Sequence, residues 1–185
     1  MEKNYSSIFH MHSVTIIRNF LSKEECSELN EWAIQNENKE FFKTGKEAEN
    51  RKTTRYSKNI EFKYPILILE KFQHFKKEFG VENLNNIEQG KNGIICAIST
   101  NGSILRKHKD PSHNNFNSFH LVIQTSKSEI GGELVINDRV YKVNEGDVLC
   151  FFADCNEHYT TENIGSKPRI VWILGIKMNF KKTLT

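Results

Sequence analysis

The sequence lacks long apolar runs, a strong charge of either sign, and any repeat or low-complexity segment. Its longest apolar runs, such as PILIL and IVWIL, are far shorter than the ~20 residues that span a bilayer. The N-terminal stretch MEKNYSSIFHMHSV has no long apolar core and no small-residue cleavage site, so no secretory leader is expected. The net charge of +3 neither demands nor excludes a nucleic-acid partner. We expect an ordinary soluble globular protein located in the cytoplasm.

Closely spaced cysteines are also missing, because none of the four cysteines has a C-x-x-C neighbour. Their positions exclude a zinc ribbon and favour buried, reduced thiols over a disulfide framework. A chain of 185 residues can bury roughly 70% of its unfolded surface, so it needs neither a disulfide nor a metal in order to fold. We expect a single domain over residues 1–185.

The first half of the chain, about residues 14–90, has helical patterns after one short strand at SVTIIRNFL. Ser22 and Glu25 form an S-x-x-E capping box, which predicts the start of a helix. Apolar residues follow at helical spacing. A second helix is predicted from Pro65 to Gly80, with an aromatic stripe that we interpret as core.

The second half, about residues 91–180, consists of short β-rich runs separated by turn residues. The runs are GIICAIS, FHLVIQT, GELVIN, RVYKV, DVLCFF and RIVWILGI. The predicted turns are Asn101-Gly102, Gly131-Gly132, Asn137-Asp138, Glu145-Gly146 and Ile164-Gly165. Many short strands at this spacing indicate a sandwich or barrel. The predicted fold class is α+β and mostly β: a double-stranded β-helix (jelly-roll) core with N-terminal supporting helices.

His108 and Asp110 are two residues apart in the stretch RKHKDPSHNN. With seven His and four Asp, roughly 0.15 such pairs (7 × 4/185) are expected by chance. On a strand, residues i and i+2 point to the same face, so the imidazole and the carboxylate would converge. Pro111 would end the strand. Two ligands do not make a metal site, so a third is needed from elsewhere in the chain.

His158 is the candidate for the third ligand. It follows the strand DVLCFF, and the stretch after it reads as a hairpin with a two-residue turn at Ile164-Gly165. In that register His158 lies opposite Val171, and Arg169 lies diagonal to it on the same face, roughly 7–8 Å away. Two His and one Asp are the facial triad typical of non-haem iron(II) oxygenases, and a guanidinium binds a carboxylate through two parallel hydrogen bonds.

These residues carry a resemblance that runs over most of the chain. The similar segments, in order, are FLSKEECSEL, RYSKNIEF, NGSILRKHKD, GGELVI, EGDVLCFF and HYTTENIGSKPRIVWIL. Together they resemble the iron(II)- and 2-oxoglutarate-dependent dioxygenases, and within these the prolyl 4-hydroxylase-like group. The resemblance implies that His108, Asp110 and His158 are catalytic iron ligands and that Arg169 binds the distal carboxylate of 2-oxoglutarate.

By the same resemblance, Gln124 falls near a position that often supplies a second contact to 2-oxoglutarate. Lys167 competes with Arg169, but Pro168 separates it from the strand, so we prefer Arg169. Relatives often have a Tyr about ten residues before the first ligand, where this sequence has Ile98 or Ser99. His113 and His120 are interpreted as a loop residue and a strand residue, not as additional ligands.

The function that the resemblance implies is hydroxylation of an unactivated C–H bond, with Fe(II) as cofactor and 2-oxoglutarate and O2 as co-substrates. Halogenating relatives have a small residue where this chain has Asp110, which favours hydroxylation. The expected substrate is a prolyl or other amino-acid side chain in a peptide or protein. The alternative is a free amino acid or a natural-product intermediate. The sequence does not identify the substrate or the oligomeric state.

Two other functions remain open: a zinc or manganese hydrolase or isomerase on a similar barrel, and a non-catalytic jelly-roll module that binds metal. A nucleic-acid demethylase is disfavoured, because such relatives have a second Arg six residues after the clamp, where Gly175 stands here.

The charged stretch KTGKEAENRKTTRYSK, residues 43–58, has no periodicity and reads as a solvated loop. Its basic residues are Lys43, Lys46, Arg51, Lys52, Arg55 and Lys58, opposed by Glu47 and Glu49. A second hypothesis is a mobile basic lid over the active site that favours a substrate with a carboxylate, phosphate or acidic flank.

Overall fold

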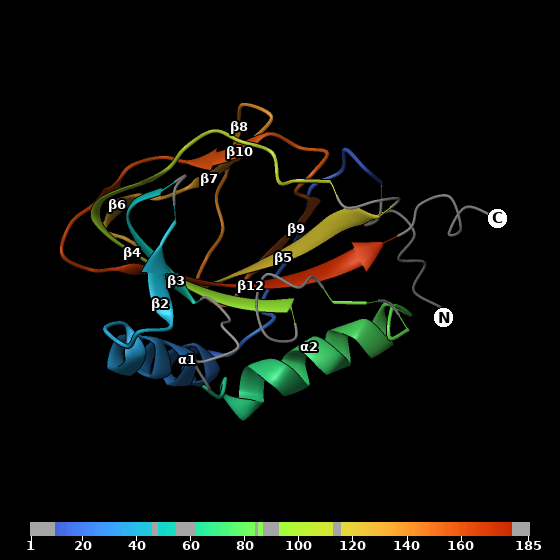
Figure 1. Cartoon of the computed structure of the whole chain (residues 1–185), viewed down its shortest axis with the longest axis horizontal. Helices are drawn as coiled ribbons and strands as arrows, with labels where there is room; N and C mark the ends of the chain where they lie inside the picture. Colours follow the sequence, from blue (N-terminus) through green and yellow to red (C-terminus); the bar gives the residue numbers. More distant parts are fainter. Residues whose placement is uncertain are drawn as a thin grey trace.

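The computed structural model describes residues 10–45, 48–54, 62–83, 85–86, 93–112 and 116–178, and the structural statements below concern these residues. They form three layers: two helices, a large antiparallel sheet and a small antiparallel sheet. Figure 1 shows helices α1 (Lys23–Asn36) and α2 (Ile66–Glu78) on one side of the large sheet, with the small sheet on the other side.

The large sheet has the strand order β1-β9-β5-β12-β4-β11-β6, and β3 joins it through β4, with β2 paired to β3. Its strands are β1 (Thr15–Ile17), β2 (Phe42–Thr44), β3 (Ala48–Thr54), β4 (Ile94–Leu105), β5 (Asn117–Ser126), β6 (Ile130–Gly131), β9 (Val148–Phe152), β11 (Asn163–Ile164) and β12 (Arg169–Met178). The small sheet has the order β10-β7-β8, with β7 (Leu134–Ile136), β8 (Arg139–Tyr141) and β10 (His158–Thr160). The expected class, α+β and mostly β, is confirmed.

Strand β12 contributes side chains to both hydrophobic cores of the protein. It is almost continuously apolar, because both of its faces are covered. Ile170, Trp172 and Leu174 belong to the core between the large sheet and the helices. Val171 belongs to the core between the two sheets, and Ile173 packs against that core. The side chains of Arg169, Val171 and Ile173 therefore face the interior between the sheets, where a ligand cavity also lies.

Both helices begin where the sequence predicts. Ser22 caps α1, and the capping box with Glu25 is complete, because each side chain accepts a hydrogen bond from the backbone N–H of the other residue. Pro65 is the N-cap of α2. The aromatic stripe is core, as expected: Phe72 and Phe75 are fully buried against the large sheet.

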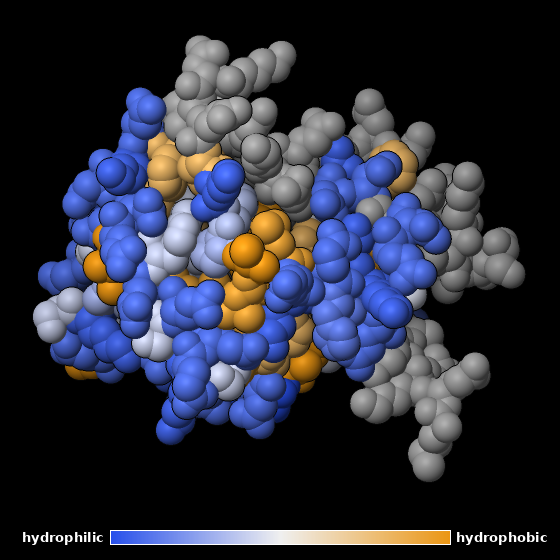
Figure 2. Space-filling view, turned by 90° about the horizontal axis from the view of Figure 1, so that it is seen from below, coloured by the Kyte–Doolittle hydropathy of each residue, from blue (hydrophilic) through white to orange (hydrophobic). Residues whose placement is uncertain are grey.

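The helical face of the molecule is mainly hydrophilic and has an apolar patch near its centre (Figure 2). The exposed large apolar residues of the helices are Ile34 and Ile66. Of the helices described, none combines the length and the apolar character needed to cross a membrane.

The expected solvated loop over residues 43–58 is wrong for its described part. Residues 42–44 and 48–54 form β2 and β3, and β3 pairs with β4 inside the large sheet. The charged side chains on β3 made this stretch read as a loop. A strand that buries only one face can carry charged residues on its other face. Residues 46–47 and 55–61 lie outside the described part of the chain.

The predicted turn at Asn101-Gly102 is also wrong, because β4 continues through these two residues to Leu105. Gly102 has a φ of +74° there, and the pairing of β3 with β4 shifts register between Glu49 and Arg51. The Asn137-Asp138 turn is confirmed: both residues have positive φ and connect β7 to β8. All four cysteines are free thiols, and Cys26, Cys96 and Cys150 are buried.

Candidate metal centre and co-substrate cavity

His108 and His158 lie opposite each other as an antiparallel backbone pair. The N–H of each residue donates to the carbonyl of the other, with N···O distances of 3.1 and 2.8 Å. Nδ1 of each imidazole also lies within hydrogen-bond distance of a backbone carbonyl two residues earlier. The distance is 2.7 Å from His108 to the carbonyl oxygen of Arg106 and 3.0 Å from His158 to that of Asn156. A carbonyl only accepts, so Nδ1 carries the proton in both rings. The lone pair is then on Nε2, the atom that faces Asp110.

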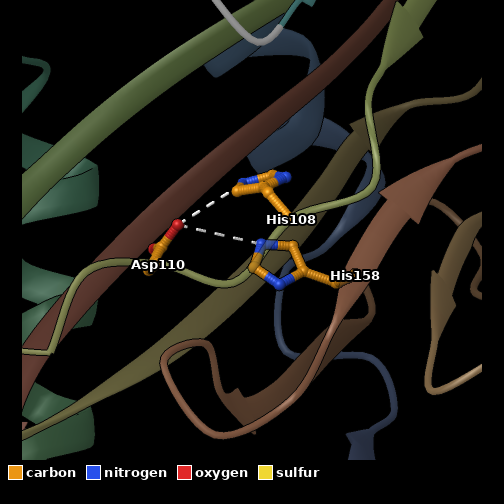
Figure 3. A group of neighbouring side chains, drawn as sticks. All are labelled: His108, Asp110 and His158. Carbon is orange, nitrogen blue, oxygen red and sulfur yellow. Dashed lines mark ion pairs between the residues drawn. The ribbon is translucent and has the colours of Figure 1, made fainter.

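Asp110 completes a cluster that can hold a metal ion. Its backbone N–H donates to the carbonyl of Ala153 at 3.0 Å, which fixes the chain beyond His108. Oδ1 lies 3.4 Å from Nε2 of His108 and 4.0 Å from Nε2 of His158 (Figure 3). One ligand atom from each of the three residues lies within 4.8 Å of the other two. Two imidazole nitrogens and one carboxylate oxygen are the donor set typical of non-haem iron(II) sites that keep coordination positions open.

The protonation states of these groups also suit metal binding. Burial lowers the pKa of His158 to about 4, which keeps the ring neutral at neutral pH. Burial alone would raise the pKa of Asp110. The three imidazoles around it, those of His108, His120 and His158, outweigh the effect of burial and hold that pKa well below its usual range. A neutral imidazole and an ionised carboxylate are the forms that bind metal.

His120, on β5, is a site residue that the sequence interpretation missed. It is 8% exposed, and its Nε2 lies 3.5 Å from Oδ2 of Asp110. The two oxygens of Asp110 thus face different partners: Oδ1 faces His108 and His158, and Oδ2 faces His120. The alternation of FHLVIQT places His120 on the same face as Val122, but only the strand pairing shows that this face meets Asp110.

Two adjoining cavities lie beside this cluster. The larger has a volume of about 340 Å³, and all four residues of the cluster line it. The smaller, of about 40 Å³, lies between the two sheets and is mainly apolar, with Arg169 in its wall. His120 and His158 line both cavities, so the wall that carries Arg169 is continuous with the candidate metal site.

Arg169 fits the role of a carboxylate receptor. It is 4% exposed, and its Nε has no hydrogen-bond partner among the described residues. Burial, and then the nearby charge of Arg51, lower the pKa of Arg169 to about 9, so it is still a cation at neutral pH. Gly132 makes room for it, because a Cβ at Gly132 would lie 2.8 Å from Cδ of Arg169. A buried cation with an unused donor can bind a carboxylate through charge-assisted hydrogen bonds.

The hairpin by which we related His158 to Arg169 is wrong. Strand β10 pairs with β7 in the small sheet, whereas Arg169 lies opposite Ser99 on β4. The intervening residues form β11, which pairs with β4 and β6 instead of turning straight back. His158 and Arg169 line the same cavity nevertheless, because their strands face each other across the interior.

The two other residues considered for binding 2-oxoglutarate, Lys167 and Gln124, do not line the cavity that contains Arg169. Lys167 is half exposed, and its Nζ forms an ion pair with Glu145 at 2.7 Å. Gln124 is buried, donates from Nε2 to the carbonyl of Ser126, and lines a separate small cavity beside Gly131 and Gly132. Its contact with the co-substrate remains a prediction.

At the position where relatives often have a Tyr, Ile98 faces the helices and Ser99 faces the interior.

Of the basic residues in the charged stretch, Arg51 lines both cavities. Lys52 points away from them and hydrogen-bonds Asn38. Lys46, Glu47, Arg55, Lys58 and His113 lie outside the described residues.

No family model matches the sequence, and no curated protein sequence matches it significantly. Solved structures do match. A viral collagen prolyl hydroxylase from Paramecium bursaria Chlorella virus-1, in complex with 2-oxoglutarate, is 18% identical with a TM-score of 0.64, over 89% of this chain and 95% of that one. A prolyl hydroxylase from Trichoplax adhaerens, in complex with a hypoxia-inducible-factor peptide, is 13% identical with a TM-score of 0.64, over 93% and 86%.

A third match is HygX from Streptomyces hygroscopicus, with nickel, 2-oxoglutarate and hygromycin B bound. It is 10% identical with a TM-score of 0.63, over 95% of this chain and 86% of that one. This chain has the fold of the 2-oxoglutarate- and iron(II)-dependent oxygenases. The resemblance stated from the sequence motifs is therefore confirmed at the level of the fold, including the expected jelly-roll core with its supporting helices.

Proposed function

We propose that the protein is an iron(II)- and 2-oxoglutarate-dependent oxygenase that hydroxylates a C–H bond. The observation that carries the proposal is the combination of two features in one interior. His108, Asp110 and His158 converge within 4.8 Å, and the buried cation Arg169 lines the cavity that His158 also lines. A zinc or manganese hydrolase would have no use for a buried guanidinium with an unused donor beside the metal site.

In this proposal His108, Asp110 and His158 hold the iron, and Arg169 binds the distal carboxylate of 2-oxoglutarate. When bound, iron and 2-oxoglutarate supply the oxidising power, because O2 oxidises 2-oxoglutarate to succinate and CO2 while one oxygen atom is inserted into the substrate C–H bond. The chain's own residues orient these groups. Asp110 provides negative charge on one side of the site, and apolar side chains such as Val171 exclude water from the cavity between the sheets.

The proposed substrate is an amino-acid side chain in a peptide or protein. Two of the similar structures are prolyl hydroxylases, one of them in complex with a peptide. The larger cavity, of about 340 Å³, has room for a side chain next to the metal site. A small-molecule substrate is the second candidate, since HygX was solved with hygromycin B bound.

The proposal is tested by loading purified protein with iron(II) and measuring succinate formed from 2-oxoglutarate in the presence and absence of O2. We expect slow succinate formation without substrate and faster formation with the correct one, found from panels of peptides, amino acids and aminoglycosides. Alanine at His108, Asp110 or His158 should abolish both activities and iron binding. Succinate formation that does not depend on these residues would contradict the proposal.

Arg169→Ala and Lys167→Ala separate the two candidate clamps. Loss of one partner of a buried, charge-assisted pair costs about 2–5 kcal/mol, so Arg169→Ala should raise the 2-oxoglutarate requirement at least tenfold without loss of iron. Lys167→Ala, at an exposed ion pair, should leave it unchanged. The reverse pattern would move the role to Lys167.

A further inference from the structure

Arg51 and Arg169 lie in one row across three neighbouring strands. Ser99 on β4 pairs with Arg51 of β3 on one side and with Arg169 of β12 on the other. Residues that are directly opposite each other in a sheet project to the same face, so both arginines face the interior between the two sheets. Neighbouring strands are about 4.8 Å apart, which places the two arginine Cα atoms roughly 10 Å from each other. Two guanidinium groups at this spacing can both contact one small ligand between them.

The cavity between the sheets confirms that both arginines reach the same space. Arg51 and Arg169 both line the smaller cavity, together with His120 and His158. Among the described residues, the rest of its wall is apolar apart from Thr160. The described part of this cavity wall therefore presents two cationic side chains to the same space.

The two arginines repel each other. The charge of Arg51 is the second cause, after burial, of the lowered pKa of Arg169. Glu133 opposes this effect, but its carboxylate already accepts a hydrogen bond from the Thr161 hydroxyl at 2.7 Å. Like charges in a partly buried site are unfavourable, and an anion between them removes the cost.

We propose that Arg51 is a second carboxylate-binding residue, which shares the distal carboxylate of 2-oxoglutarate with Arg169. The inference rests on the proposed function, because it assigns a further residue to the same co-substrate. The same chemistry would also suit a carboxylate supplied by the substrate, since Arg51 lines the larger cavity as well. The position of Arg51 in the wall of the smaller cavity favours the co-substrate.

The test compares Arg51→Gln with Lys52→Gln in the full-length protein. Both variants lose one positive charge from β3, but Lys52 points to the other face and contacts Asn38. Manganese(II), which does not turn over, is titrated first, and 2-oxoglutarate is then titrated into the manganese-loaded protein by calorimetry. Arg51→Gln should weaken 2-oxoglutarate binding at least tenfold with unchanged manganese affinity, whereas Lys52→Gln should change neither more than twofold.

A second measurement uses the stabilisation of the fold by bound ligand. The melting temperatures of the wild type and Arg51→Gln are measured without ligand first, so that each protein has its own reference. With manganese and 2-oxoglutarate, Arg51→Gln should gain less in melting temperature than the wild type does. Arg51→Lys keeps the positive charge but cannot form the bidentate hydrogen bonds of a guanidinium with a carboxylate. Its affinity for 2-oxoglutarate should therefore lie between those of the wild type and Arg51→Gln.

Three outcomes would overturn the inference. Unchanged 2-oxoglutarate affinity in Arg51→Gln, with a raised KM for the substrate, would assign the residue to a substrate carboxylate. Unchanged values for both ligands would leave it no binding role. A variant that melts well below the wild type without ligand would show that Arg51 is structural. Absence of 2-oxoglutarate binding in the wild type would instead contradict the proposed function itself.

Discussion

At the scale of single residues, the two carboxylate oxygens of Asp110 have different neighbours. Its Oδ1 faces the two imidazoles that would share the metal, and its Oδ2 faces His120. A carboxylate that binds through one oxygen leaves more positions open on the metal than one that binds through both. The group that contacts the second oxygen therefore influences how many positions remain for the co-substrates.

We predict that His120 positions Asp110. His120→Leu should lower manganese(II) affinity about 10- to 100-fold, the usual cost of removing a residue that orients a ligand. His120→Gln can keep an N–H directed at Oδ2 and should restore most of that affinity. Manganese titration followed by electron paramagnetic resonance measures both.

The melting temperature of the metal-free variants is the control, because His120 is buried and its loss also affects packing. Equal metal affinity in His120→Leu and the wild type would show that the side chain only fills space.

At the scale of elements, the connection between β6 and β7 leaves room for the side chain of Arg169. Gly132 lies between β6 and β7 with a φ of +71°. A Cβ at this position would lie 2.7 Å from Oγ of Ser128 and 2.9 Å from Oδ1 of Asn163, as well as against Arg169. The turn predicted at Gly131-Gly132 is not found as such, because Gly131 belongs to β6, and Gly132 follows the strand where it leaves room for Arg169.

Gly132→Ala should therefore weaken 2-oxoglutarate binding, because the new methyl group pushes the Arg169 side chain out of position. Gly80→Ala is the matched control: Gly80 has a φ of +67°, but a Cβ there meets nothing within 4 Å. Both variants should lose about 1–2 kcal/mol of stability from backbone strain. Only Gly132→Ala should lose co-substrate affinity in calorimetry, and equal affinity in the two variants would refute the role of this contact.

The side chain of Asp147 links two segments through hydrogen bonds: the start of β9, which it directly precedes, and the segment after β1. Its buried carboxylate accepts hydrogen bonds from the backbone N–H groups of Asn19 and Asn144 and from the side chain of Arg18. Burial alone would raise its pKa, but these donors together lower it. Asp147→Asn should cost about 1–3 kcal/mol in urea unfolding at pH 7.

The pH dependence gives a further check. The pKa of Asp147 is lower in the folded state than its usual value near 3.8, so its contribution is complete above that value. The contribution disappears as the pH falls through the lower, folded-state pKa. The difference in stability between wild type and Asp147→Asn should therefore shrink between pH 4 and pH 2. A difference that is constant with pH would show that charge is not its cause.

At the scale of the whole molecule, the candidate site draws on strands from distant parts of the sequence. Arg51, His120, His158 and Arg169 come from β3, β5, β10 and β12, and the two sheets must pack together before these residues share a cavity. A ligand that binds only this assembled state stabilises the whole fold.

We predict that manganese(II) with 2-oxoglutarate raises the melting temperature and that a chelator reverses the effect. A ligand at 100 times its dissociation constant adds about 2.7 kcal/mol, or roughly 5–10 °C for a domain of this size. Differential scanning calorimetry of the wild type and Asp110→Ala checks it. A shift of equal size in Asp110→Ala would place the metal at a different site.

Much of this protein follows from local pattern. The capping box predicts where α1 begins, the β-rich run RIVWILGI predicts a strand, and the two-residue spacing of His108 and Asp110 predicts that their side chains converge. These features depend on backbone geometry within a few residues of each other, so the sequence alone determines them.

Only the tertiary structure decided which strands meet. It paired β10 with β7 instead of β12, brought His120 to Asp110, and made a strand of residues that read as a charged loop, with Arg51 in the same row as Arg169. A shift of one residue in pairing turns every side chain of a strand to the opposite face, and local pattern does not specify the partner. The partners are set by the packing of both faces of the large sheet, against the helices on one side and the small sheet on the other.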